Sequence, residues 1–223
     1  MKKLADIDFR TFYEVNEYVA KTTPMRTHYH SKNSIERWIW TRKKQIIHEF
    51  LQSIPYETVL DVGCGDGGLF GLLSGKAQYT GIDISPTQLA AFRSQIKKLK
   101  VKSSPTLIEA DITKLPLKDA SFDLALACDV LEHVLDPEKV LREFKRVVKK
   151  DGYIIFSIPN EPLLQLSRLM TLRFPLRSPD HLYAITVQDV KTFFPHVVGE
   201  RGIPLSLFNQ ANLINMLLVT NDR

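Results

Sequence analysis

The sequence predicts an α/β fold, a mostly parallel sheet with helices on both faces. From Thr58 onward, short apolar runs with strand character alternate with helical patterns, and the connections between them are short. A glycine-rich turn follows the first run. The 223 residues, 44% hydrophobic and 25% charged, match one soluble globular domain. We therefore expect a single domain over 1–223, with an N-terminal helical lid and lead-in helix (1–54), a ligand-binding core (55–160), and a substrate lid with a C-terminal hairpin (161–223).

The elements are expected in the following order. Before the first strand, Phe9, Phe12, Val15 and Val19 indicate a short helix ending near Pro24, and a long helix begins at Asn33, where Asn33 and Glu36 can cap it. The strands are predicted at Val59–Val62, Tyr79–Ser85, Thr106–Ile112, Phe122–Val130, Tyr153–Pro159 and Asn212–Asn221. Helices are predicted over Gly68–Lys76, after the Ser85-Pro86 cap, from Asp136 to a stop at Gly152, and from a capping box at Thr186–Asp189 through Phe194. The last two strands, joined by Gly199 to Asn212, should form an antiparallel hairpin.

Charge and cysteine content narrow the class of protein. The formal charge is +5, but the basic residues, among them Lys43 and Lys44, are spread over predicted helix faces and ends, which indicates a solvated surface rather than a nucleic-acid patch. No secretory signal or membrane span is recognised. Cys64 and Cys128 lack metal-ligand spacing, so we expect reduced thiols in a cytoplasmic protein and no metal site.

The stretch "VLDVGCGDG", Val59 to Gly67, is typical of a strand-to-helix turn that approaches a nucleoside ligand. In an open α/β sheet, ligands bind beyond the carboxyl ends of the strands, where the strand order reverses. Asp83, sixteen residues after Gly67, ends the second strand and can accept both ribose hydroxyls, as in NAD enzymes and S-adenosylmethionine enzymes alike. The loop differs from the G-x-G-x-x-G pattern, because Asp66 would lie beside a pyrophosphate and Asp61 suits a cationic amino group. S-adenosyl-L-methionine is therefore the expected cofactor.

Five segments in order also carry a family resemblance: "VLDVGCGDG", "GIDIS", "ADITKLPL", "FDLALACDVLEHV" and "VVKKDGYIIFSIPN". Together they resemble the class I S-adenosylmethionine-dependent methyltransferases, in particular the small-molecule group typified by ubiquinone-biosynthesis methyltransferases. The resemblance covers about Thr58 to Asn160. It implies a Rossmann-like, seven-stranded, mostly parallel sheet whose last strand is antiparallel.

The resemblance also implies a role for individual residues. Asp61, Gly63 and Gly65 would lie at the methionine moiety and Asp83 at the ribose hydroxyls. The adenine contacts would be Ile84, Asp111 and Ile112, and the backbone of Cys128 would face the cofactor amine. Simpler structural roles also exist for these residues, since an Asp at a strand end often caps a local turn and a buried Cys packs as a small apolar residue.

Two histidines are candidates for contact with the methyl acceptor. His133, in "LEHV" after the fourth strand, has a side chain suited to act as a general base, although it can also be a packed structural residue. His181, in "SPDHLY", is a candidate substrate contact. "CDVL" stands where exocyclic-amine nucleic-acid methyltransferases have N-P-P-Y or D-P-P-Y, so a small-molecule acceptor is expected and nucleic acid is not.

The remaining interpretations concern covering segments and rival functions. The leucine-rich insertion Pro162–Pro179, with Arg168, Arg173 and Arg177, is interpreted as a lid over the core, an apolar substrate tunnel or a membrane-surface contact. Trp38, Trp40 and Arg42 can cover the cofactor or simply pack along a helix face. A noncatalytic nucleoside-binding module and a nicotinamide-dependent oxidoreductase remain alternatives.

Overall fold

The computed structural model describes residues 1–5, 7–22, 33–73, 77–99, 104–170, 172, 174–178, 180–203 and 212–222. Its helices are α1 (Phe9–Thr22), α3 (Ser34–Gln52), α4 (Phe70–Leu73), α5 (Pro86–Leu99), the 3-10 turn η1 (Leu131–His133), α6 (Pro137–Val147), α7 (Glu161–Met170) and α8 (Val187–Phe193). Its strands are β1 (Lys2–Lys3), β2 (Thr58–Val62), β3 (Gln78–Asp83), β4 (Thr106–Glu109), β5 (Phe122–Cys128), β6 (Val148–Pro159), β7 (Tyr183–Ala184), β8 (Val197–Ile203) and β9 (Ile214–Thr220).

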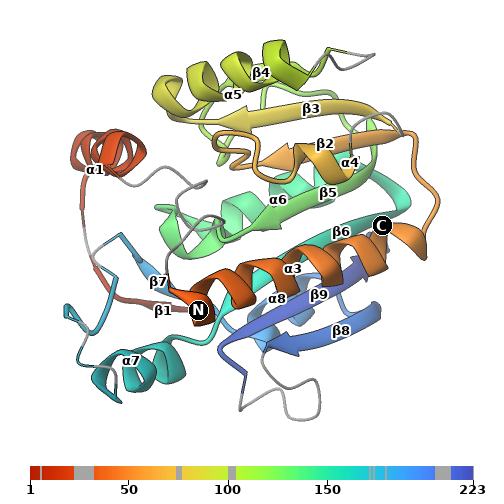
Figure 1. Ribbon diagram of the computed structural model, residues 1–223. Helices are drawn as coiled ribbons and strands as arrows, with labels where there is room; N and C mark the ends of the chain where they lie inside the picture. The colour runs from red at the N-terminus through yellow and green to blue at the C-terminus, as the bar shows by residue number, and fades with distance from the viewer. Residues whose placement is uncertain are drawn as a thin grey trace.

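The main sheet has seven strands among the described residues, in the order β4-β3-β2-β5-β6-β9-β8 (Figure 1). Strand β9 runs antiparallel to both of its neighbours, and the other pairs are parallel. This confirms the predicted Rossmann-like sheet and its antiparallel last strand. The chain crosses from β4 on one side of β2 to β5 on the other, so the strand order reverses beside β2. That reversal places a ligand site at the carboxyl ends of β2 and β5.

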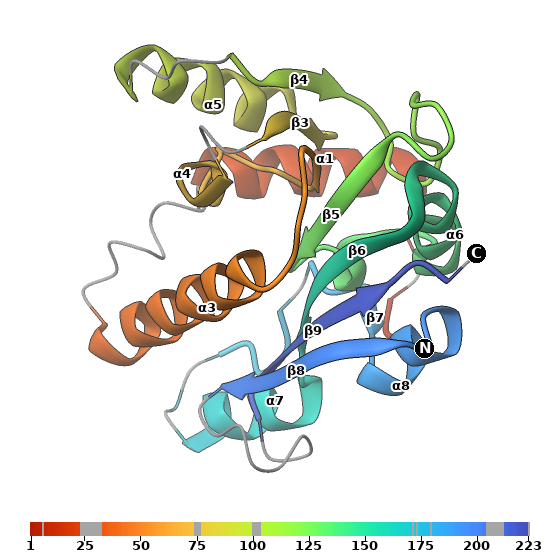
Figure 2. The same cartoon turned by 90° about the vertical axis from the view of Figure 1, so that its right-hand side faces the viewer.

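Helices cover both faces of the sheet, with α3 and α4 on one side and α6 and α8 on the other (Figure 2). The alternation along β2 explains this arrangement, since successive side chains of a strand point to opposite faces. Leu60 and Val62 belong to the core under α6 and α8, whereas Val59 belongs to the core under α3, α4 and α5. Both sets are buried. Burial on both faces holds the strand ends, and the residues after them, in fixed positions.

The predicted caps are present. Asn33 accepts hydrogen bonds from the N–H groups of Ile35 and Glu36 at 2.9 and 3.2 Å, and Thr186 forms the capping box with Asp189.

The predicted helix stop at Gly152 is wrong, because α6 ends at Val147 and Gly152 lies inside β6. A Cβ at Gly152 would approach the Asp123 carbonyl oxygen to 3.0 Å, so this glycine serves close strand packing.

Several expected features lie outside the described residues. These are the end of the predicted helix at Lys76, Pro24, Arg173, Pro179 and the hairpin loop over 204–211.

The two predicted lid segments meet each other. Helix α1 lies near the start of α5, where Glu17 accepts hydrogen bonds from the hydroxyls of Ser85 and Thr87, the latter at 2.6 Å. Strand β1 pairs antiparallel with β7, which follows the leucine-rich insertion. The N-terminal arm is thus joined both to the carboxyl end of β3 and to the second lid.

The insertion after β6 exposes five of its large apolar side chains. Leu166, Leu169, Met170, Leu172 and Phe174 are 49–78% exposed, whereas Leu163 and Leu164 are half-buried. None of the described helices is both long and apolar enough to span a bilayer.

Candidate active site

The glycine turn after β2 has a backbone that only glycine adopts easily. Gly63, Gly65 and Gly67 have φ values of 69°, 52° and 83°. A Cβ on Gly63 would lie 2.4 Å from Val130 Cγ2, and one on Gly67 would lie 2.4 Å from the Phe92 ring. The turn therefore packs closely against the segment after β5 and against α5, and its N–H groups face the strand ends.

Two carboxylates flank this turn. The buried Asp61 accepts a 2.6 Å hydrogen bond from the Tyr79 hydroxyl, and burial raises the pKa of Asp61 to about 7 although that bond opposes the shift. Asp83 accepts the N–H groups of Gly65 and Ser85, each at 2.8 Å, and burial raises its pKa as well. Each oxygen of Asp83 thus holds one local bond and keeps a second lone pair for a ligand hydroxyl.

The other predicted adenosine contacts lie along the same edge of the sheet. Asp111 follows the end of β4, and its carboxylate accepts the N–H of Thr113 at 2.8 Å, which is a local turn bond. Ile112 is buried in the core under α6, with 8% of its surface exposed. Ile84 is half-buried between Asp83 and Ser85. Among Asp111, Ile112 and Ile84, it is Ile84 that remains partly exposed directly beside the Asp83 carboxylate.

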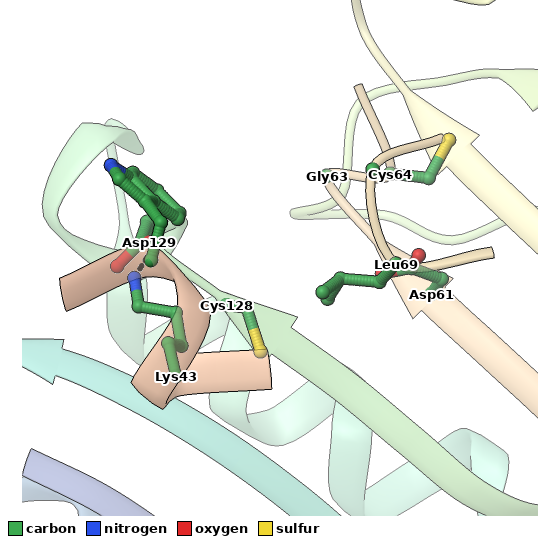
Figure 3. Close-up of a pocket in the computed structure, with 9 residues that line it drawn as sticks. Lys43, Asp61, Gly63, Cys64, Leu69, Cys128 and Asp129 are labelled. Carbon is green, nitrogen blue, oxygen red and sulfur yellow. Dashed lines mark hydrogen bonds and ion pairs between the residues drawn. The ribbon is translucent and has the colours of Figure 1, made fainter. Parts of the chain in front are cut away.

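A small pocket opens between the glycine turn and the end of β5. Its lining residues are Trp40, Lys43, Asp61, Gly63, Cys64, Gly68, Leu69, Cys128 and Asp129. Figure 3 shows the Lys43 side chain pointing toward Asp129, on the opposite side of the pocket from the glycine turn. The cavity measures about 30 Å³. Pockets that hold drug-sized ligands measure roughly 300–1,000 Å³, so this cavity alone is smaller than a nucleoside site.

Lys43 corrects the expectation that the basic residues are all solvated. It is 1% exposed, forms an ion pair with Asp129, and places its Nζ 4.1 Å from the centre of the Trp40 ring. Burial alone would raise the pKa of Asp129, but the Lys43 ammonium and a 2.6 Å bond from the Ser157 hydroxyl hold it below its ordinary value. Asp129 also has a positive φ of 57°, a conformation often found at functional sites.

Replacing Lys43 with methionine is expected to destabilise the protein by about 3 kcal/mol, because it leaves the Asp129 carboxylate without its cation in a site that excludes water. The double variant Lys43→Met/Asp129→Asn should recover most of that loss, since the asparagine carries no charge and keeps an acceptor for Ser157. Urea unfolding of the wild-type protein and both variants measures the difference. Equal stability of the single variant and wild type would contradict the ion pair's role.

The two cysteines have the environment of packing residues. Both are unpaired, and burial raises the pKa of each thiol well above its ordinary value. A thiol of high pKa is a poor nucleophile. Cys128 lies at the pocket wall, and its backbone ends β5.

The fold brings His133 and His181 together, although they were predicted as separate candidates. Their ring centres are 4.7 Å apart and their planes meet at 83°. His133 Nδ1 lies 3.0 Å from the Asp180 carbonyl oxygen, and His181 Nδ1 contacts the Glu161 carboxylate. Burial by itself would lower the pKa of His181, but the bond to Glu161 and nearby carboxylates raise it. The 3-10 turn η1 that carries His133 begins two residues after Asp129, which lines the pocket, although neither histidine does.

Sequence reasoning missed four residues of this region: Lys43, Glu132, Glu161 and Asp180. Lys43 stands in a helix among other basic residues, and its burial is visible only once α3 lies against the sheet. Glu132 is adjacent to His133 in "LEHV", and Asp180 is adjacent to His181 in "SPDHLY". An acid beside each candidate histidine was therefore a usable signal.

Comparison with known proteins agrees with this geometry. Residues 60–156 match the family described as a methyltransferase domain. A probable S-adenosylmethionine-dependent methyltransferase of Mycobacterium tuberculosis is 32% identical over 123 residues, which are 54% of this chain and 43% of that protein. A ubiquinone biosynthesis O-methyltransferase of Nitrosomonas europaea is 32% identical over 117 residues, 51% of this chain and 48% of that protein. The chain thus spans less than half the length of these curated relatives.

A solved structure extends the likeness to nearly the whole chain. The N-methyltransferase NodS of Bradyrhizobium japonicum, solved with S-adenosyl-L-homocysteine, superposes with a TM-score of 0.68 at 17% identity, over 95% of this chain and 99% of that one. The sheet order and this superposition show a Rossmann-like fold shared with that methyltransferase structure. Residues 60–156, which are less than half of the chain, are thus similar to the methyltransferase domain family.

Proposed function

We propose that the protein is an S-adenosyl-L-methionine-dependent methyltransferase that methylates an oxygen of a small-molecule or lipid-like acceptor. The observation that carries the cofactor assignment is the pair Asp61 and Asp83, which lie at the carboxyl ends of the adjacent strands β2 and β3, beside a positive-φ glycine turn. A carboxylate suits an ammonium group, and a second one suits ribose hydroxyls. Asp66, buried in the same turn, disfavours a diphosphate there.

The chain's residues would position the donor and the acceptor. S-adenosylmethionine supplies a methyl group on a sulfonium, which a nucleophile displaces in line. Asp61, Gly63 and Gly65 would hold its methionine part, and Asp83 with Ile84 would hold the ribose side. Asp111 and Ile112 would border the adenine, and the Cys128 backbone would face the amine. Positioning of this kind supplies much of the rate in group transfer.

His133 is the residue that we assign to the acceptor. Its Nδ1 faces the Asp180 carbonyl, which fixes the proton on that nitrogen and leaves the Nε2 lone pair available. A hydroxyl acceptor has to lose a proton during methylation, and a neutral imidazole can take it. The O-methyltransferase among the relatives supports an oxygen acceptor. His181, with its ring against His133, would contact the same acceptor.

A thermal-shift comparison of S-adenosylmethionine, S-adenosylhomocysteine and NAD tests the cofactor. A ligand at 100 times its dissociation constant stabilises the folded state by about 2.7 kcal/mol. Stabilisation by NAD alone would favour the oxidoreductase alternative. A screen of hydroxylated aromatic, carboxylate and amine acceptors then tests catalysis, and a protein that binds the cofactor but methylates none of them would favour the noncatalytic module.

The raised pKa of Asp61 predicts how cofactor affinity depends on pH. Since that pKa is about 7, Asp61 loses its charge as the pH falls below 7, whereas an α-amino group stays protonated. Binding of the cation should therefore weaken from pH 7.5 to 5.5, approaching about tenfold per unit. Calorimetry measures the dissociation constant at each pH. The Asp61→Asn variant should bind more weakly at pH 7.5 and lose this pH dependence, and a flat wild-type profile would remove Asp61 from the ammonium site.

A further inference from the structure

Three side chains from two distant segments converge beside the pocket. Glu132 and His133 lie in η1 after β5, and His181 lies before β7. One potential ligand atom from each lies within 4.8 Å of the others. The two segments are joined by a 2.7 Å hydrogen bond from the Leu182 N–H to the Glu132 carbonyl. The cluster is therefore held by the backbone and does not depend on contacts among the three side chains.

The two imidazoles are oriented as metal ligands commonly are. His133 directs Nδ1 at the Asp180 carbonyl, and His181 directs Nδ1 at the Glu161 carboxylate. Metal-binding histidines usually donate one ring N–H to such an oxygen, which fixes the tautomer and presents the lone pair of the other nitrogen to the ion. Both rings thus have the outer partners that metal binding requires.

Glu132 supplies the independent observation. Its side chain is 2% exposed, and its Oε2 has no hydrogen-bond partner among the described residues. Its other oxygen, Oε1, lies 3.9 Å from His133 Nε2, too far for a hydrogen bond. Leaving a buried carboxylate oxygen without a partner is costly, so such groups are usually paired or coordinate metals.

We propose that Glu132, His133 and His181 bind one divalent first-row transition-metal ion, with coordination positions left open for the acceptor's oxygen. Two imidazoles and one carboxylate form a ligand set used by catalytic zinc and nonhaem iron sites. This differs from the sequence-based expectation of no metal, which rested on cysteine spacing. Here the ligands come from an adjacent Glu-His pair and a remote histidine, so no local spacing reports them.

The role of the ion rests on the proposed function. A cation lowers the pKa of a hydroxyl bound to it. The acceptor O–H bond then breaks and its proton passes to solvent, the new O–CH₃ bond forms, and the breaking S–CH₃ bond leaves its electron pair on a neutral thioether. With the ion bound, His133 Nε2 acts as a ligand and cannot accept a proton. The ion then promotes the loss of the acceptor proton that a free imidazole would otherwise remove.

The test is metal binding by the untagged full chain after treatment with a chelator. Equilibrium dialysis with Zn²⁺, Mn²⁺ and Co²⁺, followed by elemental analysis, should give one tightly held ion per chain for at least one of them. Co²⁺, if held, should also produce visible absorption bands. Glu132→Gln and His181→Gln should each weaken binding at least about 10-fold, in the range reported for lost metal-site partners. The matched control His196→Gln alters a histidine that is 69% exposed and should bind like wild type.

Two results would overturn the proposal: no binding of any of the three ions by the wild-type chain, or undiminished binding by both folded ligand variants. Circular dichroism identifies a variant that fails to fold, and the wild-type titration stands without the variants. Failure of the proposed function gives a different pattern. If only the metal proposal is wrong, the chelated protein still binds S-adenosylmethionine and methylates its acceptor at the full rate. If the function is wrong, metal binding persists without cofactor binding or methyl transfer.

Discussion

Replacing His133 with alanine is expected to lower the rate of methyl transfer to a hydroxyl acceptor by about 10²–10³-fold. The variant loses Nε2, the ring nitrogen that we assign to the acceptor because Nδ1 is held by the Asp180 carbonyl. Affinity for S-adenosylmethionine should change little, because the imidazole acts on the acceptor and His133 is not among the proposed cofactor contacts. Single-turnover rates and calorimetric cofactor affinity, measured on the same preparation, separate the two effects.

His196→Ala is the matched control, since its side chain is 69% exposed and pairs with Asp222. It should keep the wild-type rate. If the true acceptor is a neutral amine, no proton has to be removed before attack, and His133→Ala should cost much less. Near-normal turnover of His133→Ala on a hydroxyl acceptor would show that the histidine is structural.

Replacing Asp83 with alanine is expected to weaken S-adenosylmethionine binding by roughly 10- to 150-fold, corresponding to about 1.5–3 kcal/mol for a lost charged hydrogen-bond partner. The ribose hydroxyls lose their acceptor. The N–H groups of Gly65 and Ser85 also lose theirs, so the glycine turn becomes less fixed. Calorimetry at pH 8 gives the affinity.

Asp83→Asn is the informative control, because the amide keeps one oxygen for a backbone N–H and removes the charge. It should fall between wild type and the alanine variant. Thermal unfolding without cofactor shows how much of the loss comes from the turn itself. Unchanged affinity in a folded Asp83→Ala protein would remove this residue from the site.

The fold was predictable because its signals are local. Each central strand is a short apolar run, and the caps at Asn33 and Thr186 use side chains that bond within three residues. The helix end predicted at Gly152 was wrong because a glycine that follows a helical pattern usually marks the end of the helix. The actual helix end depends on Asn221, whose side chain donates to the carbonyl oxygens of Lys145 and Val148. The sequence around the helix end cannot indicate a hydrogen-bond partner so far along the chain.

The candidate site likewise has residues that the sequence predicts and residues that it does not. Asp61, Asp83 and the glycines follow strands, so their common edge follows from strand order alone. Lys43 could not be assigned, because whether a lysine in an amphipathic helix is buried depends on the angle at which α3 meets the sheet. The distance between His133 and His181 was also beyond reach, since it is fixed by the bond between the Leu182 N–H and the Glu132 carbonyl.

The pairing of β1 with β7 has a kinetic consequence. The N-terminal arm is attached to the start of α5 through Glu17 and to the segment around His181 through β1. We therefore expect a movement of the segment around His181 to reach the sheet edge where Asp83 lies through this arm. We expect the two substrates to bind in a compulsory order, the first one before the N-terminal arm takes up its final position. Product-inhibition patterns in steady-state kinetics would then differ for the two products instead of being competitive throughout.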